Sequence, residues 1–286
     1  MAVMKVAAIQ MRSETSPARN AADMERMVRE AAGQGAAYVQ TPEMTGALVR
    51  DSEARASAFT SEDKDVVAAT AGRLARELGI FLHIGSTAIL RADGKLANRA
   101  LLYGPDGARV AAYDKIHMFD VDLDNGESWR ESSAYEPGAQ SMVAGLGGAK
   151  LGFAICYDLR FPQLFRAEAL AGAEILSVPA AFTRQTGEAH WHVLLRARAI
   201  ENGAFVVAAA QGGRHEDGRE TYGHSMVVDP WGRILAEADH DEPGVIVAEI
   251  DTAQVAATRR KIPNLKNARE FSAGAAATAQ LRGAAS

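Results

Sequence analysis

The stretch Lys150-Leu-Gly-Phe-Ala-Ile-Cys-Tyr-Asp-Leu-Arg-Phe-Pro162 joins a strand-like apolar run to a helix-like one. A strand that runs into a helix is the basic unit of an α/β fold, and the junction exposes a side chain at the edge of the sheet. Cys156, the only cysteine of the chain, occupies that junction. Free N–H groups at a helix start would lower the pKa of its thiol and supply oxyanion donors. Cys156 is therefore a candidate nucleophile, with a buried structural cysteine as the alternative.

Composition narrows the class of protein. The chain has 286 residues, of which 48% are hydrophobic and 23% charged, as in a soluble globular protein. The formal net charge of -5 argues against a nucleic-acid or anionic-membrane partner. A lone cysteine forms no intrachain disulfide, the opening residues resemble a strand more than a secretory signal, and no apolar run reaches the roughly 20 residues of a membrane span. These features predict a cytoplasmic protein without a membrane partner.

Hydrophobic periodicity predicts strands that alternate with helices. The first half is expected to hold strands at 3–11, 36–40 and 80–89, helices at 20–33 and 61–79, and a hairpin of 96–103 with 109–113. The second half is expected to hold strands at 142–143, 151–155, 174–179 and 204–210, helices at 161–171 and 188–202, and strands at 225–229, 233–236 and 245–250 that close a second sheet.

No linker divides residues 1–270, which we expect to form one domain. The segment 114–138 is too long for an ordinary connection and is expected to be functional. Small residues dominate 271–286, which predicts a tail that is mobile or lies over a partner subunit.

Several kinds of cofactor site have no sequence signal. There are no paired cysteines, and the seven histidines form no His-x-x-x-His pair, so no metal is expected. The glycine patterns that bind dinucleotides or nucleotide phosphates are also missing, and no Gly-x-Ser-x-Gly motif marks a serine nucleophile. The thiol remains the best candidate for the chemistry.

Two ionisable residues follow other predicted strands. Glu43 comes after the strand that ends in Thr41-Pro-Glu43, and Lys115 follows the second strand of the hairpin. Ligands of open α/β sheets bind at the carboxyl ends of the strands, so Glu43, Lys115 and Cys156 could converge there. A cysteine hydrolase needs such a base and such a cation. The alternative for each charged residue is a solvated loop position.

Four motifs together resemble the nitrilase, or carbon-nitrogen hydrolase, superfamily. They are Thr41-Pro-Glu43, Tyr113-Asp-Lys-Ile-His-Met-Phe-Asp120, Gly152-Phe-Ala-Ile-Cys-Tyr-Asp-Leu-Arg-Phe-Pro162 and Pro179-Ala-Ala-Phe182, and the resemblance extends over residues 4–270. It implies an α/β fold built as a four-layer αββα sandwich with mixed sheets, no cofactor, and association through helices into homodimers or higher homo-oligomers.

The resemblance also implies roles in the hydrolysis of linear amides. Glu43 would be the general base and acid, Cys156 the nucleophile that carries a thioester, and Lys115, with the backbone N–H of Tyr157, the group that holds the oxyanion. The family has a second active-site glutamate, and Glu131 matches it by its spacing in the sequence from Pro137-Gly138. The competing candidates nearby are Glu127 and Glu136.

Within the superfamily, the sequence around Cys156 resembles the Nit amidase branch, and later segments resemble its deaminated glutathione amidase group. The implied substrate is a small-molecule amide of a keto acid, with deaminated glutathione cleaved to 2-oxoglutarate and cysteinylglycine. Arg160 would clamp the keto-acid carboxylate, and Phe182 and Thr186 match pocket positions. The structural alternatives are an Asp158–Arg160 ion pair, a core aromatic and a helix-cap threonine.

Three other functions stay open. An ω-amidase would cleave 2-oxoglutaramate or 2-oxosuccinamate, and a broader aliphatic amidase would accept amides without a keto-acid carboxylate. A non-catalytic interaction protein would keep the fold alone, but it would have no need of all three of Glu43, Lys115 and Cys156.

Overall fold

Two six-stranded mixed sheets form the centre of the molecule. The computed structural model describes residues 3–122, 126 and 128–274. In spatial order the first sheet comprises β16 (Gly244–Asp251), β1 (Val3–Gln10), β2 (Tyr38–Gln40), β3 (Phe81–Leu90), β4 (Leu96–Tyr103) and β5 (Arg109–Asp114). The second comprises β15 (Ile234–Glu237), β14 (Met226–Val228), β11 (Phe205–Ala208), β10 (Ile175–Ser177), β9 (Ala149–Phe153) and β8 (Val143–Leu146). The three central strands of each sheet, β1–β2–β3 and β9–β10–β11, are parallel.

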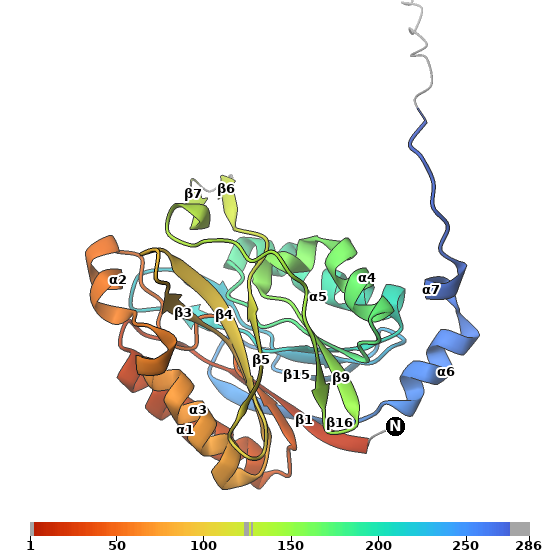
Figure 1. Cartoon of the computed structure of the whole chain (residues 1–286), viewed down its shortest axis with the longest axis horizontal. Helices are drawn as coiled ribbons and strands as arrows, with labels where there is room; N and C mark the ends of the chain where they lie inside the picture. The colour runs from red at the N-terminus through yellow and green to blue at the C-terminus, as the bar shows by residue number, and fades with distance from the viewer. Residues whose placement is uncertain (1–2, 123–125, 127, 275–286) are drawn as a thin grey trace, which may run out of the picture.

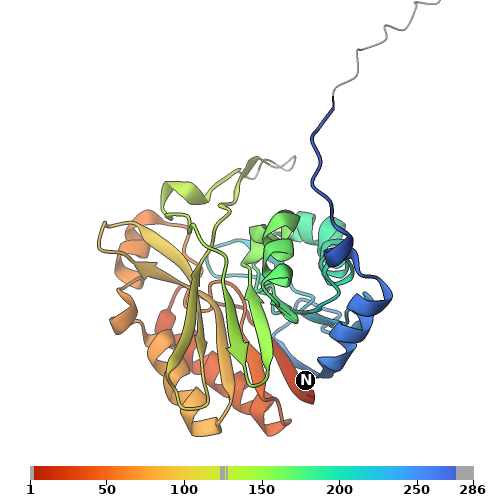
Figure 2. The ribbon, with the colours of Figure 1, turned by 45° about the vertical axis from the view of Figure 1, so that its right-hand side comes forward.

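Helices cover the outer face of each sheet (Figures 1 and 2). Helices α1 (Pro17–Gly33) and α3 (Val66–Leu78) pack on the first sheet, and α4 (Pro162–Leu170) and α5 (Arg184–Asn202) on the second. The predicted four-layer αββα sandwich with mixed sheets is confirmed. The remaining helical elements are α2 (Ser52–Ala58), α6 (Ala253–Lys261), α7 (Asn264–Asn267) and the 3-10 turns η1 (Glu62–Lys64), η2 (Glu131–Ser133) and η3 (Cys156–Arg160). Two small ribbons pair β6 (Asp120–Asp122) with β7 (Ser128–Arg130) and β12 (Gly212–Arg214) with β13 (Glu220–Tyr222).

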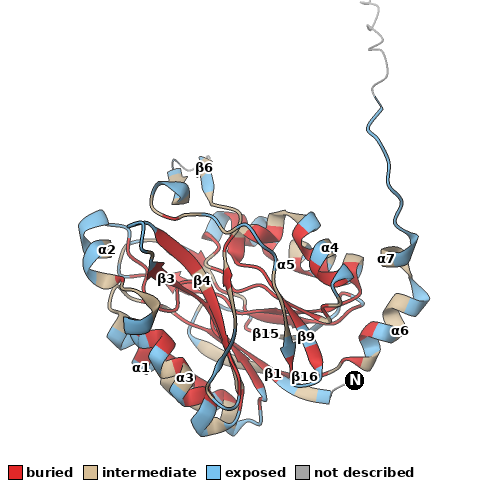
Figure 3. Ribbon diagram, viewed as in Figure 1, coloured by how far each residue is buried: buried red, intermediate tan, exposed pale blue. Residues whose placement is uncertain are grey.

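The core lies between these layers, where the strands are buried and the helices expose only their outer faces (Figure 3). Tyr38 and Leu102 of the first sheet share one apolar cluster with Phe153 of the second. A separate cluster packs Met24 of α1 and Leu74 of α3 against the other face of the first sheet. Full burial of one such side chain stabilises the fold by about 1.5–3 kcal/mol, so the inner layers fix the strand ends in place.

One predicted strand belongs to the other sheet. We expected 245–250 to close the second sheet, but β16 pairs antiparallel with β1 along eight residues, from Val3 opposite Asp251 to Gln10 opposite Gly244. Without β16 the backbone groups along that side of β1 would be unpaired, and buried backbone groups need partners. The chain therefore returns from the second sheet to complete the first.

Helix boundaries and minor elements also differ from the prediction. The helix expected from residue 61 starts at Val66, because the Asp65 side chain accepts a hydrogen bond from the N–H of Ala68 and caps it. The helix expected from 188 starts at Arg184, within a polar segment that shows no apolar period. Helices α2, α6 and α7 were not predicted, since α2 and α7 bury no residue and α6 buries only Val255.

The predicted tail falls mostly outside the described residues, because 275–286 are not among them, and 271–274 carry no helix or strand. Within the described part of the chain, no helix is both long and apolar enough to cross a membrane.

Candidate active site

The carboxyl ends of strands from both sheets open into one cavity of about 690 Å³, which we call the active-site cavity. Glu43 follows β2, Lys115 follows β5 and Cys156 follows β9, and all three line this cavity. The structure thus brings together the three residues that the sequence placed at strand ends. Each is buried, with an exposed fraction of 4% for Glu43, 2% for Lys115 and 7% for Cys156.

The Lys115 ammonium lies between two carboxylates. Its Nζ is 2.9 Å from Oε1 of Glu43 and 2.8 Å from Oε2 of Glu131. A buried lysine is stable only when it is paired in this way. Glu131 is fixed in turn by the backbone N–H of Phe119, at 2.7 Å from its Oε2.

Of the three candidates for the second glutamate, the structure places Glu131 in the site. Glu136 instead forms an ion pair with Lys95 and does not line the cavity. Glu127 lies outside the described residues.

Asn98 in β4 joins the two carboxylates and was not predicted. Its Nδ2 donates to Oε1 of Glu43 at 2.9 Å and to Oε1 of Glu131 at 3.0 Å. The second oxygen of Glu43 accepts from the N–H of Ala181 at 2.9 Å. Asn98 is fully buried in a strand that also contains Arg99, and the sequence alone does not show that the Asn98 side chain points inward.

These contacts set the charges of the Glu43–Lys115 pair. Burial raises the pKa of Glu43, but the Lys115 charge and hydrogen bonds from Lys115, Cys156 and Asn98 outweigh it, so the pKa lies below its ordinary value. Burial lowers the pKa of Lys115, but Glu131 and Glu43 outweigh it and hold the pKa well above its ordinary value. The free site therefore contains a carboxylate base beside an ammonium cation.

The thiol has the opposite pKa shift from the one expected. Burial, followed by the negative charge of Glu43, raises the pKa of Cys156 well above its ordinary value, although Lys115 partly opposes this. The expected N–H donors are also weaker than a long helix would supply, because Cys156 opens a single 3-10 turn and its own N–H donates to the Pro179 carbonyl at 2.8 Å. The thiol keeps its proton until a base removes it.

The backbone at Cys156 is strained. Its φ of 49° lies in the left-handed region, which costs a non-glycine residue about 1–3 kcal/mol and recurs at active sites. The turn places Tyr157 second in the 3-10 helix, where its N–H has no acceptor within the helix. That N–H is available to a ligand at the sulfur.

Asp158 ties the loop of Lys115 to the loop of Cys156. Its buried carboxylate accepts from the Tyr113 hydroxyl at 2.7 Å, from the Ile155 N–H at 2.9 Å and from the His117 N–H at 3.0 Å. The suggested Asp158–Arg160 ion pair is therefore wrong, since these donors occupy Asp158. Arg160 lies beside His190 instead, with 3.3 Å between Nη1 and Nδ1.

Arg160, Phe182 and Thr186 line the active-site cavity close to the nucleophile. The Arg160 guanidinium lies 5.4 Å from the ring centre of Phe182 and 5.9 Å from that of Tyr157. Thr186 is buried and shares a 2.8 Å hydrogen bond with the hydroxyl of Thr183, the residue before α5. The suggested helix-cap role is wrong, because Thr186 lies inside α5 and no side chain caps the N-terminus of that helix. Trp191 of α5 is buried at 1% exposure.

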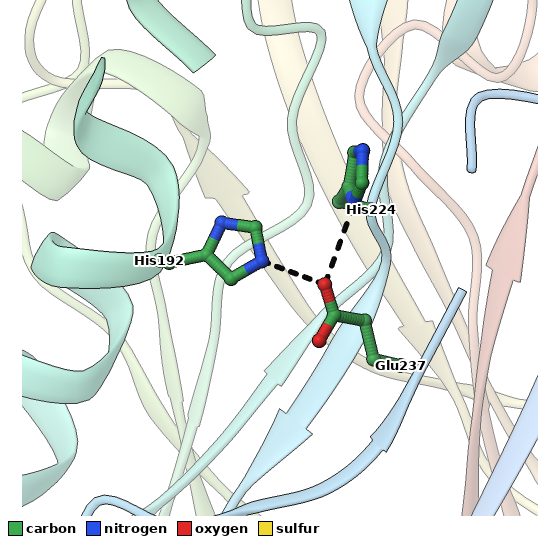
Figure 4. Close-up of side chains that lie close together, drawn as sticks. All are labelled: His192, His224 and Glu237. Carbon is green, nitrogen blue, oxygen red and sulfur yellow. Dashed lines mark hydrogen bonds and ion pairs between the residues drawn. The ribbon is translucent and has the colours of Figure 1, made fainter. Parts of the chain in front are cut away.

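A group that could hold a metal ion lies outside the cavity lining (Figure 4). Among the described residues, His192, His224 and Glu237 bring three ligand atoms within 4.8 Å of one another. Oε1 of Glu237 lies 2.6 Å from His192 and 3.3 Å from His224. These residues form no metal-binding motif in the sequence, because they come from α5, a loop and β15.

A family model described as carbon-nitrogen hydrolase matches residues 5–260. The chain belongs to the carbon-nitrogen hydrolase family. The predicted resemblance is confirmed, and the chain is a carbon-nitrogen amidohydrolase.

Individual relatives agree with this assignment. A deaminated glutathione amidase of Yersinia enterocolitica is 39% identical over 267 residues, which are 92% of each chain. Among solved structures, the C. elegans NitFhit protein superposes with a TM-score of 0.87 at 33% identity, over 93% of this chain and 65% of that one. Saccharomyces cerevisiae Nit3, a member of branch 10 of the nitrilase superfamily, gives a TM-score of 0.82 at 28% identity, over 91% and 94%.

Proposed function

We propose that this carbon-nitrogen hydrolase cleaves the amide bond of a small 2-oxo acid amide, and that its substrate is deaminated glutathione, which yields 2-oxoglutarate and cysteinylglycine. The main support for this proposal is that Glu43, Lys115 and Cys156 line one cavity, whose wall also includes Arg160. The choice of substrate is supported by the relatives named deaminated glutathione amidase.

Acylation begins at the protonated thiol. Glu43 accepts the thiol proton as Sγ of Cys156 attacks the amide carbon, since the raised pKa of Cys156 leaves almost no free thiolate. The carbonyl oxygen becomes an oxyanion that Lys115 and the Tyr157 N–H stabilise. The tetrahedral intermediate then collapses as the C–N bond breaks, and Glu43 returns the proton to the leaving nitrogen. A thioester and a free amine result.

Deacylation repeats these roles with water. Glu43 removes a proton from water, and the hydroxide attacks the thioester carbon while Lys115 again faces the oxyanion. The C–S bond breaks, and the sulfur recovers its proton from Glu43. Amide and water have become a carboxylic acid and an amine, and no cofactor takes part.

Glu131 and Arg160 complete the proposal. Glu131 positions Lys115, because its carboxylate contacts the ammonium opposite Glu43. Arg160 binds the 2-oxo acid carboxylate through its two-pronged guanidinium, and Phe182 and Thr186 form the wall of that subsite.

The alternative is an ω-amidase that acts on 2-oxoglutaramate or 2-oxosuccinamate, because the Arg160 subsite would hold these keto acids equally well. A comparison of kcat/KM for deaminated glutathione, 2-oxoglutaramate and propionamide distinguishes the three candidate activities. We expect the first to be the best substrate. Preference for 2-oxoglutaramate would favour the ω-amidase, and rapid turnover of propionamide a broader aliphatic amidase.

The mechanism is tested by Cys156→Ala and Glu43→Gln. We expect each to lower kcat by about 10³-fold or more, since each removes the nucleophile or its proton acceptor. Glu136→Gln is the matched control, because this acid pairs with Lys95 away from the cavity and should keep full activity. Substantial turnover by folded Cys156→Ala protein would refute the mechanism.

We also propose that the enzyme acts in the cytoplasm and associates as a homodimer or larger homo-oligomer through its helical layer.

A further inference from the structure

The active-site cavity has a second cationic region besides Arg160. Arg50 precedes α2, Arg55 lies within α2, and both line the same cavity as Cys156. We call these two residues the distal arginines. In Figure 1, α2 and the β6–β7 ribbon lie on the upper left of the molecule, while α4 and α5 lie to the right.

A run of aromatic rings separates the distal arginines from Arg160. The Arg50 guanidinium lies 4.6 Å from the ring centre of Trp129, whose ring is 6.3 Å from that of Phe119. Phe119 is 5.1 Å from Tyr157, the residue after the nucleophile, and Arg160 lies beyond Tyr157 at 5.9 Å. The two cationic regions thus mark opposite ends of an aromatic wall, and Cys156 lies at the Arg160 end.

The distal arginines carry charge that the described part of the chain does not neutralise. Within residues 3–122, 126 and 128–274, neither Arg50 nor Arg55 forms an ion pair. Arg219, whose guanidinium also lies over Trp129 at 5.1 Å from the ring centre, is paired with Asp217. The neighbouring Asp51 is used as the cap of α2, where it accepts from the Ala54 N–H at 2.8 Å.

The carboxylates of the lining do not cancel this charge either. Among the described residues these are Glu43, Glu131 and Glu220, of which the first two contact Lys115. Glu220 has no ion pair with either distal arginine among the described residues. A chain with a net charge of -5 therefore has two guanidinium groups on the lining of its catalytic cavity that form no ion pair among the described residues. A cavity lined in this way attracts an anionic group.

We propose that the distal arginines bind a carboxylate on the leaving-group half of the substrate, with Trp129 as the wall of that subsite. The inference rests on the proposed function and specifies its substrate class, which is an elongated amide with a carboxylate at each end. Arg160 binds the acyl carboxylate, and Arg50 and Arg55 bind the carboxylate of the departing amine. The cavity volume of about 690 Å³ suits such a ligand, since sites for drug-sized molecules span roughly 300–1,000 Å³.

Kinetics with matched substrates test the proposal. The substrates are deaminated glutathione, the same compound with its terminal carboxylate converted to a carboxamide, and 2-oxoglutaramate, whose leaving group is ammonia. We expect Arg50→Ala and Arg55→Ala each to raise KM for deaminated glutathione about tenfold with kcat little changed, because an exposed charge-assisted contact to the leaving group is lost. KM for the other two substrates should stay within about twofold.

Arg214→Ala is the control for net charge, since Arg214 is an exposed arginine on β12 that does not line the cavity. It should leave all three KM values unchanged. An equal rise in KM for all three substrates in Arg50→Ala and Arg55→Ala, or no rise at all, would overturn the subsite.

A binding experiment separates failure of the subsite from failure of the proposed function. Ligand-observed NMR on the Cys156→Ala protein compares cysteinylglycine with cysteinylglycinamide, which differ only in the terminal carboxylate. We expect at least tenfold weaker binding of the amide, and loss of this difference in the protein that also carries Arg50→Ala and Arg55→Ala. If wild-type enzyme cleaves no 2-oxo acid amide, the proposed function fails while this difference still decides the subsite. Equal binding of both dipeptides, or binding of neither, refutes the subsite even where turnover is normal.

Discussion

Glu168 is a buried carboxyl group directly behind the strand that leads to Cys156. Its Oε1 accepts from the Phe153 N–H at 3.0 Å, while its Oε2 has no hydrogen-bond partner among the described residues. The side chain is 1% exposed and packs against Gly152, where an added Cβ would lie 2.5 Å from Oε2. Burial raises the pKa of Glu168 well above its ordinary value, so the fold favours the neutral form of this group.

The raised pKa makes stability depend on pH. The unfolded chain loses this proton near the ordinary pKa of 4.5, whereas the folded chain keeps it to higher pH. Unfolding therefore releases a proton above pH 4.5, and the contribution of Glu168, complete below that pH, falls as pH rises towards the folded pKa. Glu168→Gln keeps the shape of the side chain and stays neutral, so we expect the variant to be more stable than wild type at pH 8. The free energy of unfolding of wild type should fall by up to about 1.4 kcal/mol per pH unit above pH 4.5, and this fall should be absent in the variant.

Urea unfolding between pH 5 and pH 8 measures this effect. Glu30→Gln changes an exposed glutamate of α1 and should run parallel to wild type. A Glu168→Gln curve that also runs parallel to wild type would show that Glu168 is ionised in the folded protein.

At this scale the sequence identifies the residues that follow strands. Glu43, Lys115 and Cys156 each follow a strand, so the polar residues after the predicted strands were sufficient to indicate that the three lie together at the carboxyl ends of strands. The roles of Asn98 and Asp158 could not be predicted in this way, because they depend on hydrogen bonds to residues 33 to 55 positions away in the chain. The direction of the thiol pKa shift was mispredicted for the same reason, since burial and Glu43 outweigh the local turn.

At the scale of elements, β3 holds the site together through a close approach at Gly85. An added Cβ there would lie 2.1 Å from the Thr41 carbonyl oxygen, 2.7 Å from that of Pro42 and 2.4 Å from Cβ of Pro179. Thr41 and Pro42 lead directly to Glu43, and Pro179 accepts the N–H of Cys156. Glycine at this position therefore lets the base loop and the nucleophile loop meet across the two sheets.

Gly85→Ala should loosen that junction. We expect a loss of about 1–3 kcal/mol in the free energy of unfolding, as for other overpacked core positions. We also expect kcat/KM to fall by about 10²-fold, because displacements near 1 Å at catalytic groups have effects of that size. Gly33→Ala is the control, since an added Cβ at the end of α1 meets nothing within 4 Å. Normal activity in Gly85→Ala would mean that the loops do not depend on this contact.

Elements were predicted best where the spacing of apolar residues is regular, as in helix α1 and the β4–β5 hairpin. Sheet membership of β16 was mispredicted because its periodicity describes a strand but not its partner, and pairing with β1 joins residues at opposite ends of the chain. Helices α2, α6 and α7 bury too little apolar surface to produce a periodic signal.

At the scale of the molecule, the helical layer over the second sheet exposes large apolar side chains. On α5, Val193 is 68% exposed and Ile200 is 50% exposed, two helical turns apart on one face. Leu170 at the end of α4 is 62% exposed, and Trp231, which precedes the glycine against which Ile200 packs, is 51% exposed. An apolar surface of this kind is typical of an interface between subunits.

The proposed association through this layer predicts how the molecular mass in solution responds to charge. We expect light scattering after size exclusion to give at least twice the chain mass of 30.4 kDa for wild type. The double variant Val193→Asp with Ile200→Asp should run as a monomer with its fold retained, because two buried, unpaired carboxylates at an interface cost far more than they do in water. Val110→Asp places one such carboxylate on β5, at a position that is 45% exposed on the other sheet, and should leave the mass unchanged. A wild-type mass of one chain, or an assembly that survives the double variant, would show that α5 is not the subunit interface.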